Sequence, residues 1–428
     1  MLAGIRCFFQ ESIHAKYVDT SEEDVTSASA PPWRNRLARP QRRFLIVGNP
    51  QNRRIALFQQ ALRDTGWPAA AVVQYIDLLD GRTTLASRLT PGTLVRIESP
   101  ERDFAVEKAL LRHGLADAEA EGAPVLSRRR IEDAAFDRGL ILYPRQNYLG
   151  FRRLLRTLAG DIASIPDVRV MNAPADIEIM FDKRLCHERT RAAGVPVPLS
   201  LGPVRSYDEL IMRMAAEAQS RVFVKLANGS AASGVVALQQ QGRRRIAVST
   251  TELIRTHGSI TLYNSRKIRC YTGERDIATL VNTLCREGVH VEQWLPKATL
   301  DEHGNFDLRF VVIAGRAEHV VMRQSSSPMT NLHLLNRRGD IDRLRERMGP
   351  SHWATLQTTC ERATSIFPRS LYAGIDLLLM PDLRRHVVLE MNAFGDLLPN
   401  VLHNGLATYS AELAAMWPDG PPTGVNVD

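Results

Sequence analysis

The sequence contains few cysteines and no long apolar run. Its five cysteines are odd in number, widely spaced and never arranged as CxxC, which argues against a disulfide framework or a zinc site and indicates reduced thiols. No stretch approaches the ~20 apolar residues of a membrane-spanning helix. Polar residues soon follow Cys7-Phe8-Phe9, so the start does not resemble a secretory signal. We therefore expect a cytoplasmic protein without a membrane partner.

Lysine is also scarce. Only six of the 55 basic residues are lysines, so arginine carries most of the positive charge in a chain of net charge +8. The arginines are spread along the chain and are not interleaved with aromatic residues, so we expect no nucleic-acid partner. A lysine that this chain retains is therefore a candidate for a chemical role.

The 428 residues allow two or three packed units. Residues 1–42 lack periodicity and are expected to form a disordered extension. A strand that starts at Arg43, a helix at 54–62 and a strand at 70–75 then predict an open parallel α/β domain over 43–170. Several polar residues follow its strands and are candidates for ligand contact, with an ordinary surface position as the alternative for each: Asn49, Arg96, Arg145 and Gln146.

A second unit is expected at 171–261. The spacing predicts one helix over Asp176–Ala193, ended by Gly194, with Lys183 on its polar side. A strand at 221–226 carries Lys225 and leads into a loop of small residues at 227–235. Backbone amides in such a loop, together with an ammonium, suit phosphate oxygens. A flexible turn with a surface lysine is the alternative.

A third unit is expected at 262–415, followed by a tail at 416–428. It contains a strand at 289–293 and a strand at 306–313, on which Asp307 and Arg309 share one face. Residues 374–392 predict an antiparallel hairpin turning at Leu383, because two apolar runs flank Pro-Asp-Leu-Arg-Arg. That turn places Met380 opposite His386 and Asp376 opposite Glu390. Asn392, two residues after Glu390, points to the same side of the strand as Glu390, so the three side chains form a set of oxygen donors.

Those three oxygen-bearing side chains suit Mg²⁺, which prefers a few carboxylate or carbonyl ligands together with phosphate oxygens. Two neighbouring carboxylates without a cation would repel each other. The alternative is a hairpin with ordinary solvated polar ends, and this stretch alone does not decide between the two.

From Asn172 to Asn404 the sequence resembles the ATP-grasp superfamily, in particular the glutathione-synthetase and RimK-like carboxylate–amine ligases. The matching pieces, in order, are Lys183 before Ala-Gly-Val-Pro-Val-Pro, Val-Phe-Val-Lys225 before the small-residue loop, Val-Glu292-Gln-Trp-Leu295, Asp307-Leu-Arg309, Arg323, Asn331, Gly-Ile-Asp376 and Leu-Glu390-Met-Asn392. The resemblance implies a fold of the α/β (α+β) class, with an ATP-grasp fold after the N-terminal parallel domain. Its central subdomain would be 171–261 and its C-terminal subdomain 262–415.

The same resemblance implies the site residues. ATP would contact Lys183, Lys225, Gly229, Ser230, Ser233, Gly234, Glu292, Gln293, Trp294 and Leu295. Mg²⁺, or Mn²⁺ as the alternative, would be held by Asp376, Glu390 and Asn392. The catalytic groups facing the γ-phosphate and the reacting carboxylate would be Arg309, Arg323 and Asn331. The chain departs from the family in having two glycines in its loop and no second acidic residue directly after Glu292.

The implied activity is the ATP-dependent joining of a carboxylate to an amine through an acyl phosphate, with release of ADP and phosphate. Phosphoryl transfer needs positioning and charge neutralisation rather than a protein nucleophile, which fits these residues. The substrates would be small-molecule or peptide carboxylates and amines. Two alternatives remain: a nucleotide-binding switch without turnover, and a carboxylate kinase. The oligomeric state is left open, with a homodimer as one alternative.

Overall fold

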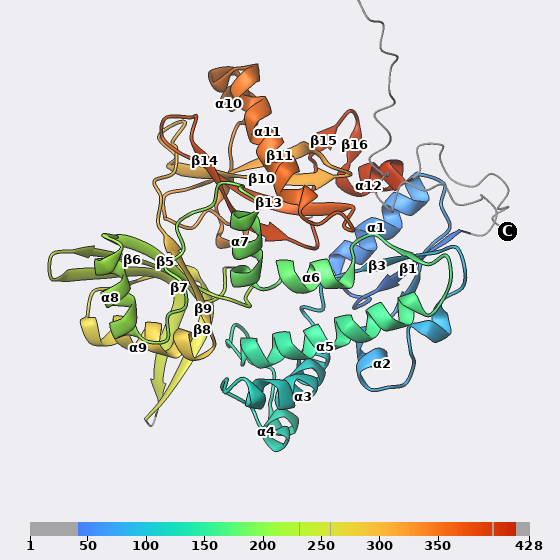
Figure 1. The fold of residues 1–428 in the computed structure, drawn as a ribbon, viewed down its shortest axis with the longest axis horizontal. Helices are drawn as coiled ribbons and strands as arrows, with labels where there is room; N and C mark the ends of the chain where they lie inside the picture. Colours follow the sequence, from blue (N-terminus) through green and yellow to red (C-terminus); the bar gives the residue numbers. More distant parts are fainter. Residues whose placement is uncertain (1–41, 231, 257, 396–397, 417–428) are drawn as a thin grey trace, which may run out of the picture.

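The computed structural model describes residues 42–230, 232–256, 258–395 and 398–416 (Figure 1). The expected extension at 1–42 and tail at 416–428 lie outside these residues, except for Arg42 and Met416. Among the described residues, no helix combines the length and the apolar character that crossing a membrane requires.

The first sheet is parallel, as predicted, and has the strand order β2-β1-β3-β4. Its strands are short and apolar, and their side chains are largely buried between helices and loops. They are β1 (Arg43–Val47), β2 (Ala71–Val73), β3 (Thr93–Ile97) and β4 (Arg169–Val170). The helices of this region are α1 (Arg53–Asp64), α2 (Tyr75–Leu79), α3 (Phe104–Ala120), α4 (Arg128–Asp133) and α5 (Pro144–Ala163).

The second sheet is antiparallel, with the order β8-β7-β6-β5-β9. An apolar core lies between it and two helices, α8 (Tyr207–Ala216) and α9 (Glu274–Arg286). Its strands are β5 (Arg221–Leu226), β6 (Val235–Gln241), β7 (Arg244–Thr256), β8 (Ser259–Tyr271) and β9 (Val289–Gln293). The sheet therefore includes residues on both sides of position 262, and the expected unit boundaries stay a prediction.

The third sheet has the order β12-β11-β10-β13-β14 and carries the hairpin expected at 374–392. Its strands are β10 (Asn305–Ile313), β11 (Arg316–Ser325), β12 (Arg337–Arg338), β13 (Tyr372–Leu379) and β14 (His386–Asn392). The remaining elements are α10 (Ile341–Met348), α11 (Pro350–Ser365), the pair β15 (Leu402–His403) and β16 (Leu406–Ala407), and α12 (Thr408–Met416). One apolar core includes residues of this sheet and α11 together with residues of the first sheet and α5.

The single helix predicted over Asp176–Ala193 is wrong. The chain forms α6 (Pro174–Met180) and α7 (Lys183–Ala192), separated by Phe181 and Asp182. The Asp182 side chain accepts a hydrogen bond from the Arg184 amide and caps α7, which favours starting a new helix. Lys183 is thereby the first residue of α7, which lies between the second and third sheets in Figure 1.

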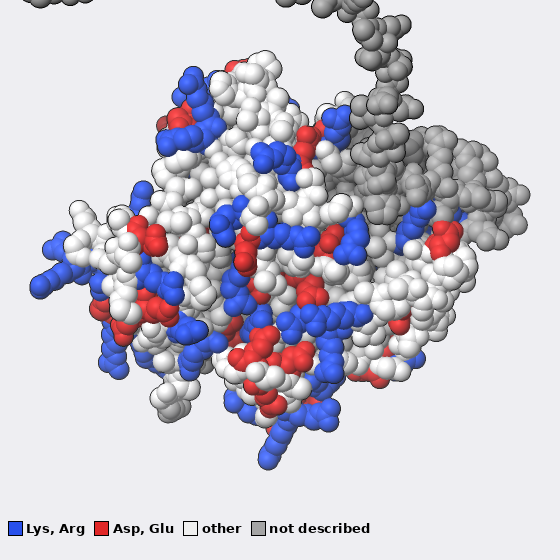
Figure 2. All heavy atoms as spheres, viewed as in Figure 1, with Lys and Arg blue, Asp and Glu red and all other residues white. Residues whose placement is uncertain are grey.

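The surface charge is mixed. Figure 2 shows lysine and arginine side chains next to aspartate and glutamate over the face that it draws, instead of one continuous basic surface. Ion pairs explain part of this pattern: Arg145 pairs with Glu121 at 2.7 Å and with Asp182 at 3.0 Å. Basic side chains on this face therefore lie among acidic ones.

Candidate active site

A cleft between the sheets encloses about 1890 Å³ of space that is open to solvent. The second sheet and its loop form one wall, the third sheet forms another, and residues of the first sheet's loops close one end. All the site residues inferred from the sequence line this cleft except Gly234 and Trp294. The predicted site residues, which lie between positions 183 and 392, thus converge in one cleft. Their individual roles stay predictions.

The two exceptions have structural explanations. Gly234 has a positive φ of 66°, and a Cβ there would lie 2.4 Å from the Leu226 side chain, so it packs behind the loop. Trp294 packs on Phe223, with ring centroids 5.4 Å apart, and the Arg221 guanidinium lies 5.4 Å from its ring centre. Both residues therefore support the cleft without lining it.

The hairpin register agrees with the prediction at the site and differs toward the turn. Asp376 faces Glu390, as expected. The expected pairing of Met380 with His386 is wrong, because Leu379 faces His386. An irregularity between Asp376 and Leu377 shifts the register by one residue, as a β-bulge does. The carboxylates stay neighbours because the shift lies on the turn side of them.

Asp376 belongs to a buried layer of charges across β11, β10 and β13. Arg309 holds both of its carboxylate oxygens, with Nη2 at 3.0 Å from Oδ2, and Arg323 Nη2 lies 3.0 Å from Oδ1. Arg323 Nε also donates to Asp307 at 2.7 Å. Burial alone would raise the pKa of Asp376, but Arg309 and Arg323 overcome this effect and hold it below its ordinary value.

Lys297 completes this layer, and the sequence reading did not include it in the site. Its Nζ lies 3.1 Å from Asp307 Oδ2 and donates to Thr330 Oγ1 at 2.7 Å. Burial lowers the pKa of Lys297, although Asp307 opposes that shift. Lys297 is one of the six lysines, so the scarcity of lysine was the signal that could have found it.

Lys225 is held in place by its own sheet. It forms an ion pair with Glu292, whose other oxygen lies 3.1 Å from His290 Nε2. Glu292 is only 1% exposed. Burial would raise the pKa of Glu292, but Lys225 and His290 lower it to about 2. Glu292 thus positions the Lys225 ammonium toward the cleft, and the predicted contact of Glu292 with nucleotide stays a prediction.

Lys183 connects the loop of the second sheet to the hairpin of the third. Its Nζ donates to the carbonyl of Gly229 at 2.6 Å and lies 3.1 Å from Glu390 Oε1. Its position at the start of α7, set by the Asp182 cap, directs it between the two sheets. One ammonium therefore joins the predicted phosphate loop to the predicted metal ligands.

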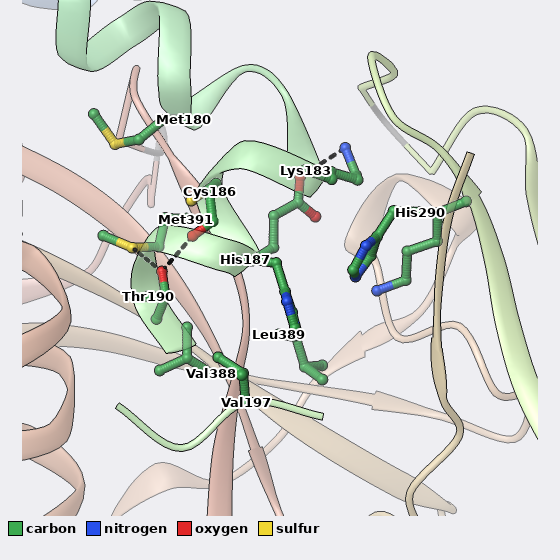
Figure 3. A pocket seen from close by; sticks show the side chains of 12 residues that line it. Met180, Lys183, Cys186, His187, Thr190, Val197, His290, Val388, Leu389 and Met391 are labelled. Atoms are coloured by element: carbon green, nitrogen blue, oxygen red, sulfur yellow. Dashed lines mark hydrogen bonds and ion pairs between the residues drawn. The ribbon is translucent and has the colours of Figure 1, made fainter. Parts of the chain in front are cut away.

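A smaller pocket of about 360 Å³ opens beside these two lysines (Figure 3). Figure 3 shows apolar side chains of α6 and β14, including Met180, Leu389 and Met391, together with the rings of His187 and His290. The two imidazole rings are 4.7 Å apart. The pocket shares Lys183, Lys225 and Glu390 with the cleft. A flat apolar ring joined to an anionic group would fit this arrangement.

The first sheet contributes residues that the sequence reading missed: Arg54, Ser99, Glu101 and Arg102. Of the strand-end residues named as candidates, none lines the cleft. Arg96 is fully buried between Glu98 and Glu412, Gln146 bonds the backbone of Leu126, and Asn49 bonds the carbonyl of Pro100. These side chains are buried because segments far apart in the sequence pack together, and a local sequence pattern does not predict such packing.

No protein-family model matches the sequence, and no curated protein matches it. Solved structures do. D-cycloserine synthetase DcsG is 15% identical, with a TM-score of 0.50, and the alignment covers 87% of this chain and 98% of that one. The ATP-grasp ligase PsnB, complexed with precursor peptide PsnA2 and AMPPNP, is 16% identical over 89% of this chain and 100% of its own, with a TM-score of 0.46. The macrocyclase MdnC from Microcystis aeruginosa MRC, bound with precursor peptide MdnA, is 14% identical over 87% and 98%, with a TM-score of 0.47. At such identities the likeness concerns the fold, and it confirms the predicted fold.

Proposed function

Because the chain has the ATP-grasp fold, we propose that it is an ATP-dependent carboxylate–amine ligase that works through an acyl phosphate and releases ADP and phosphate. One observation supports this proposal above the others. Two lysines, two neighbouring carboxylates and two buried arginines meet in one cleft, although they come from segments far apart in the sequence. Phosphate binding alone would not need the two arginines in the third sheet.

The nucleotide would lie between the second and third sheets. Its base would fill the smaller pocket against Leu389 and Met391, and its phosphates would meet Lys183 and Lys225. Gly229, Ser230, Ala232 and Ser233 border the same part of the cleft, where backbone amides would suit phosphate oxygens. Glu292 would keep the Lys225 ammonium pointed at the phosphates, because both its oxygens are already engaged.

The donor set suits Mg²⁺, with Mn²⁺ as the alternative. Asp376, Glu390 and Asn392 line the cleft together and offer only oxygen ligands, as a hard cation requires. The described residues contain no group of three His, Cys, Asp or Glu side chains that could hold a metal ion, which fits a cation that takes most of its other ligands from phosphate and water. When bound, it would neutralise charge on the transferred phosphoryl group. Lys183 and the arginines balance the same carboxylates in this structure.

The chain's own residues then account for the reaction. The substrate carboxylate oxygen attacks the γ-phosphorus of ATP, the bond to the β,γ-bridging oxygen breaks, and ADP leaves. Arg309 and Arg323 would turn from Asp376 to hold the carboxylate and the transferred group, and Asn331 lines the same cleft. The amine nitrogen then attacks the acyl carbon, phosphate leaves, and the amine loses a proton. Walls on three sides would limit access of water to the acyl phosphate.

The alternatives differ in what triggers ADP release. A ligase needs an acid and an amine, a carboxylate kinase needs the acid alone, and a switch would bind ATP without either dependence. The test incubates the full chain with Mg-ATP and a panel of small acids and acidic peptides, each with and without an amine. ADP that requires both partners supports the ligase. If ADP forms with the acid alone and an acyl phosphate accumulates, the protein is a carboxylate kinase and the ligase proposal fails.

The Arg309→Lys variant and a matched Arg316→Lys variant make this test specific. Arg309 is buried in the cleft, whereas Arg316 is exposed at the start of β11. A lysine keeps the charge but loses the two-point contact with a carboxylate or phosphate. We expect ADP formation to fall at least tenfold in the first variant and to stay unchanged in the second. A cytoplasmic location, where ATP is plentiful, is part of this proposal.

A further inference from the structure

We propose that Arg54 and Arg102 bind an anionic group of the substrate, a carboxylate or a phosphate, that is separate from the carboxylate to be activated. This inference rests on the proposed ligase function and assigns a class of substrate to it, namely acids with a second anionic group. Both arginines line the cleft at the end that the first sheet closes.

The topology of the first sheet places this end of the cleft where open parallel sheets bind ligands. In the order β2-β1-β3-β4, β2 lies on one side of β1, whereas β3 and then β4 lie on the other side. The direction of strand addition therefore reverses between β1 and β3. The crevice at the carboxyl ends of the two strands flanking such a reversal is the usual ligand site of these sheets. Arg54 follows β1, and Ser99 and Arg102 follow β3. All three side chains line the cleft.

Arg54 reaches from α1 to the segment that follows the hairpin of the third sheet. Its Nη1 donates a hydrogen bond of 2.7 Å to the carbonyl of Phe394. This is its one side-chain hydrogen bond to a described residue, so most of its five N–H donors are open to a ligand. Phe394 lies two residues after Asn392, and two residues span at most ~7 Å. Arg54 is therefore close to the predicted metal ligands.

The same segment also lies near Arg309, the arginine that would hold the reacting group. Next to Phe394, the Gly395 carbonyl lies 3.0 Å from where a Cβ on Gly374 would be, and Arg309 Nη1 lies 3.5 Å from that point. Arg54 therefore contacts the 394–395 segment directly, and Arg309 lies near the same segment. A molecule of a few carbon atoms can present one anionic group to each arginine.

Arg102 carries a second, independent indication. It has a φ of 69°, in the left-handed region that a residue with a side chain seldom adopts. It is exposed, and with the other described residues it makes neither a hydrogen bond nor an ion pair. Its loop is fixed, because Asn49 Nδ2 donates to the carbonyls of Pro100 and Glu101. An unfavourable backbone held in place with an unpaired cation at a cleft indicates a functional role.

The charge balance at this end of the cleft is positive. Glu101 also lines it and offsets one of the two arginines. In addition, Glu101 faces Glu107, and burial together with Glu101 raises the pKa of Glu107 to about 6. A ligand with both an anionic group and an ammonium could use the arginines and Glu101 together. The net charge still favours an anionic group over a neutral one.

The test measures binding of three matched pairs of acids by calorimetry with Mg-ADP present: glutamate with glutamine, aspartate with asparagine, and phosphoserine with serine. The members of each pair share an α-carboxylate and differ by one anionic group. The first two pairs test a carboxylate and the third tests a phosphate. We expect wild type to bind the anionic member of at least one pair tenfold or more tightly.

Three variants assign that preference. Arg54→Gln keeps a donor for the Phe394 carbonyl and removes the charge. Arg102→Gly removes the charge and relieves the backbone, so its thermal midpoint should equal or exceed that of wild type. We expect the preference for the anionic member of a pair to fall at least fivefold in both Arg54→Gln and Arg102→Gly. The third variant, Arg53→Gln, is the control. Arg53 is the exposed neighbour of Arg54 and does not line the cleft, so this change should leave the preference intact.

The outcomes separate the two proposals. If no anionic member binds wild type more tightly than it binds Arg54→Gln and Arg102→Gly, the anion site is refuted. If the preference exists and is lost in both variants, but no acid and amine together release ADP from Mg-ATP, the anion site stands and the ligase proposal fails. Equal loss in Arg53→Gln would also refute the site, because the effect would then be general electrostatics.

Discussion

Arg309 holds both carboxylate oxygens of Asp376 across the β10–β13 strand pair. The predicted metal ligand and a predicted substrate arginine are therefore partners in this structure. Both side chains are buried, with Arg309 8% and Asp376 4% exposed. Nucleotide binding, as we propose it, would exchange these partners: cation and phosphate would replace arginine at the carboxylate, and the arginine would turn to substrate.

Replacing Asp376 by Asn should strongly destabilise the protein. The change leaves Arg309 and Arg323 buried beside a neutral group, and removing one partner of a buried ion pair typically costs about 3–5 kcal/mol. Urea unfolding would measure this loss. Asp342→Asn is the control, because Asp342 lies on α10 with 79% of its side chain exposed, and its expected loss is below about 1 kcal/mol. A similar small loss in both variants would contradict the buried arrangement.

Mg-ATP should stabilise the folded protein through Lys183 and Lys225. At about a hundred times the dissociation constant, a ligand of the folded form adds roughly 2.7 kcal/mol to the unfolding free energy. Charge-assisted hydrogen bonds contribute about 1.5–3 kcal/mol, so Lys183→Met or Lys225→Met should weaken ATP binding about 10- to 100-fold. Thermal shift titrations would measure this effect. Lys267→Met is the matched control, since Lys267 is exposed on β8, and an equal weakening there would argue against the assignment.

The sequence predicted the parts of the site that local rules control. The turn expected at Leu383 placed Asp376 opposite Glu390, and the small residues after β5 marked the loop beside Lys225. The sequence could not show Arg54 and Arg102 in the same cleft, because their positions depend on how the first sheet packs on the third. The same holds for Arg96, which was expected at a strand end and instead pairs in the core with Glu412, 316 residues away.

The break between α6 and α7 shows a different limit. Helical periodicity continues across residues 176–193, so the apolar pattern alone predicts one helix. The Asp182 side chain favours a new N-terminus by capping α7, and it also pairs with Arg145 and Arg184. Those partners lie partly outside the segment. A local pattern thus found the helical residues but not the change of direction that places Lys183 in the cleft.

Glu292 should make the stability depend on pH in the acid range. Its pKa is about 2 in the folded protein, below the ordinary value of 4.5, because Lys225 and His290 outweigh the effect of burial. A lowered pKa stabilises the folded state above pH 4.5, and this contribution disappears as the pH falls toward 2. It amounts to about 3 kcal/mol at 1.36 kcal/mol per pKa unit.

Urea unfolding of wild type and Glu292→Gln at pH 7, 5, 4 and 3 would test this expectation. The difference between the two proteins should be largest at pH 7 and 5 and should shrink at pH 4 and 3. Other acidic groups titrate in both proteins, so the comparison isolates Glu292. A difference that stays constant from pH 7 to pH 3 would mean that Glu292 acts through packing and not through its charge.

Replacing Gly374 by Ala should reduce turnover more than stability. The new Cβ would lie 3.0 Å from the Gly395 carbonyl oxygen, so the 394–395 segment beside the cleft must shift by a few tenths of an ångström, and it would lie in ordinary contact with Arg309 Nη1 at 3.5 Å. The backbone of Gly374 is ordinary strand and needs no glycine for its φ. We expect a loss of about 1–3 kcal/mol in unfolding free energy, as for other overpacked sites. Because small misplacements of catalytic groups can cost about 100-fold in rate, ADP formation should fall by about one to two orders of magnitude. Ala373→Gly, on the neighbouring residue of β13, controls for the change in side-chain size. Full activity in Gly374→Ala would mean that the Arg309 position and the 394–395 segment are not linked through Gly374.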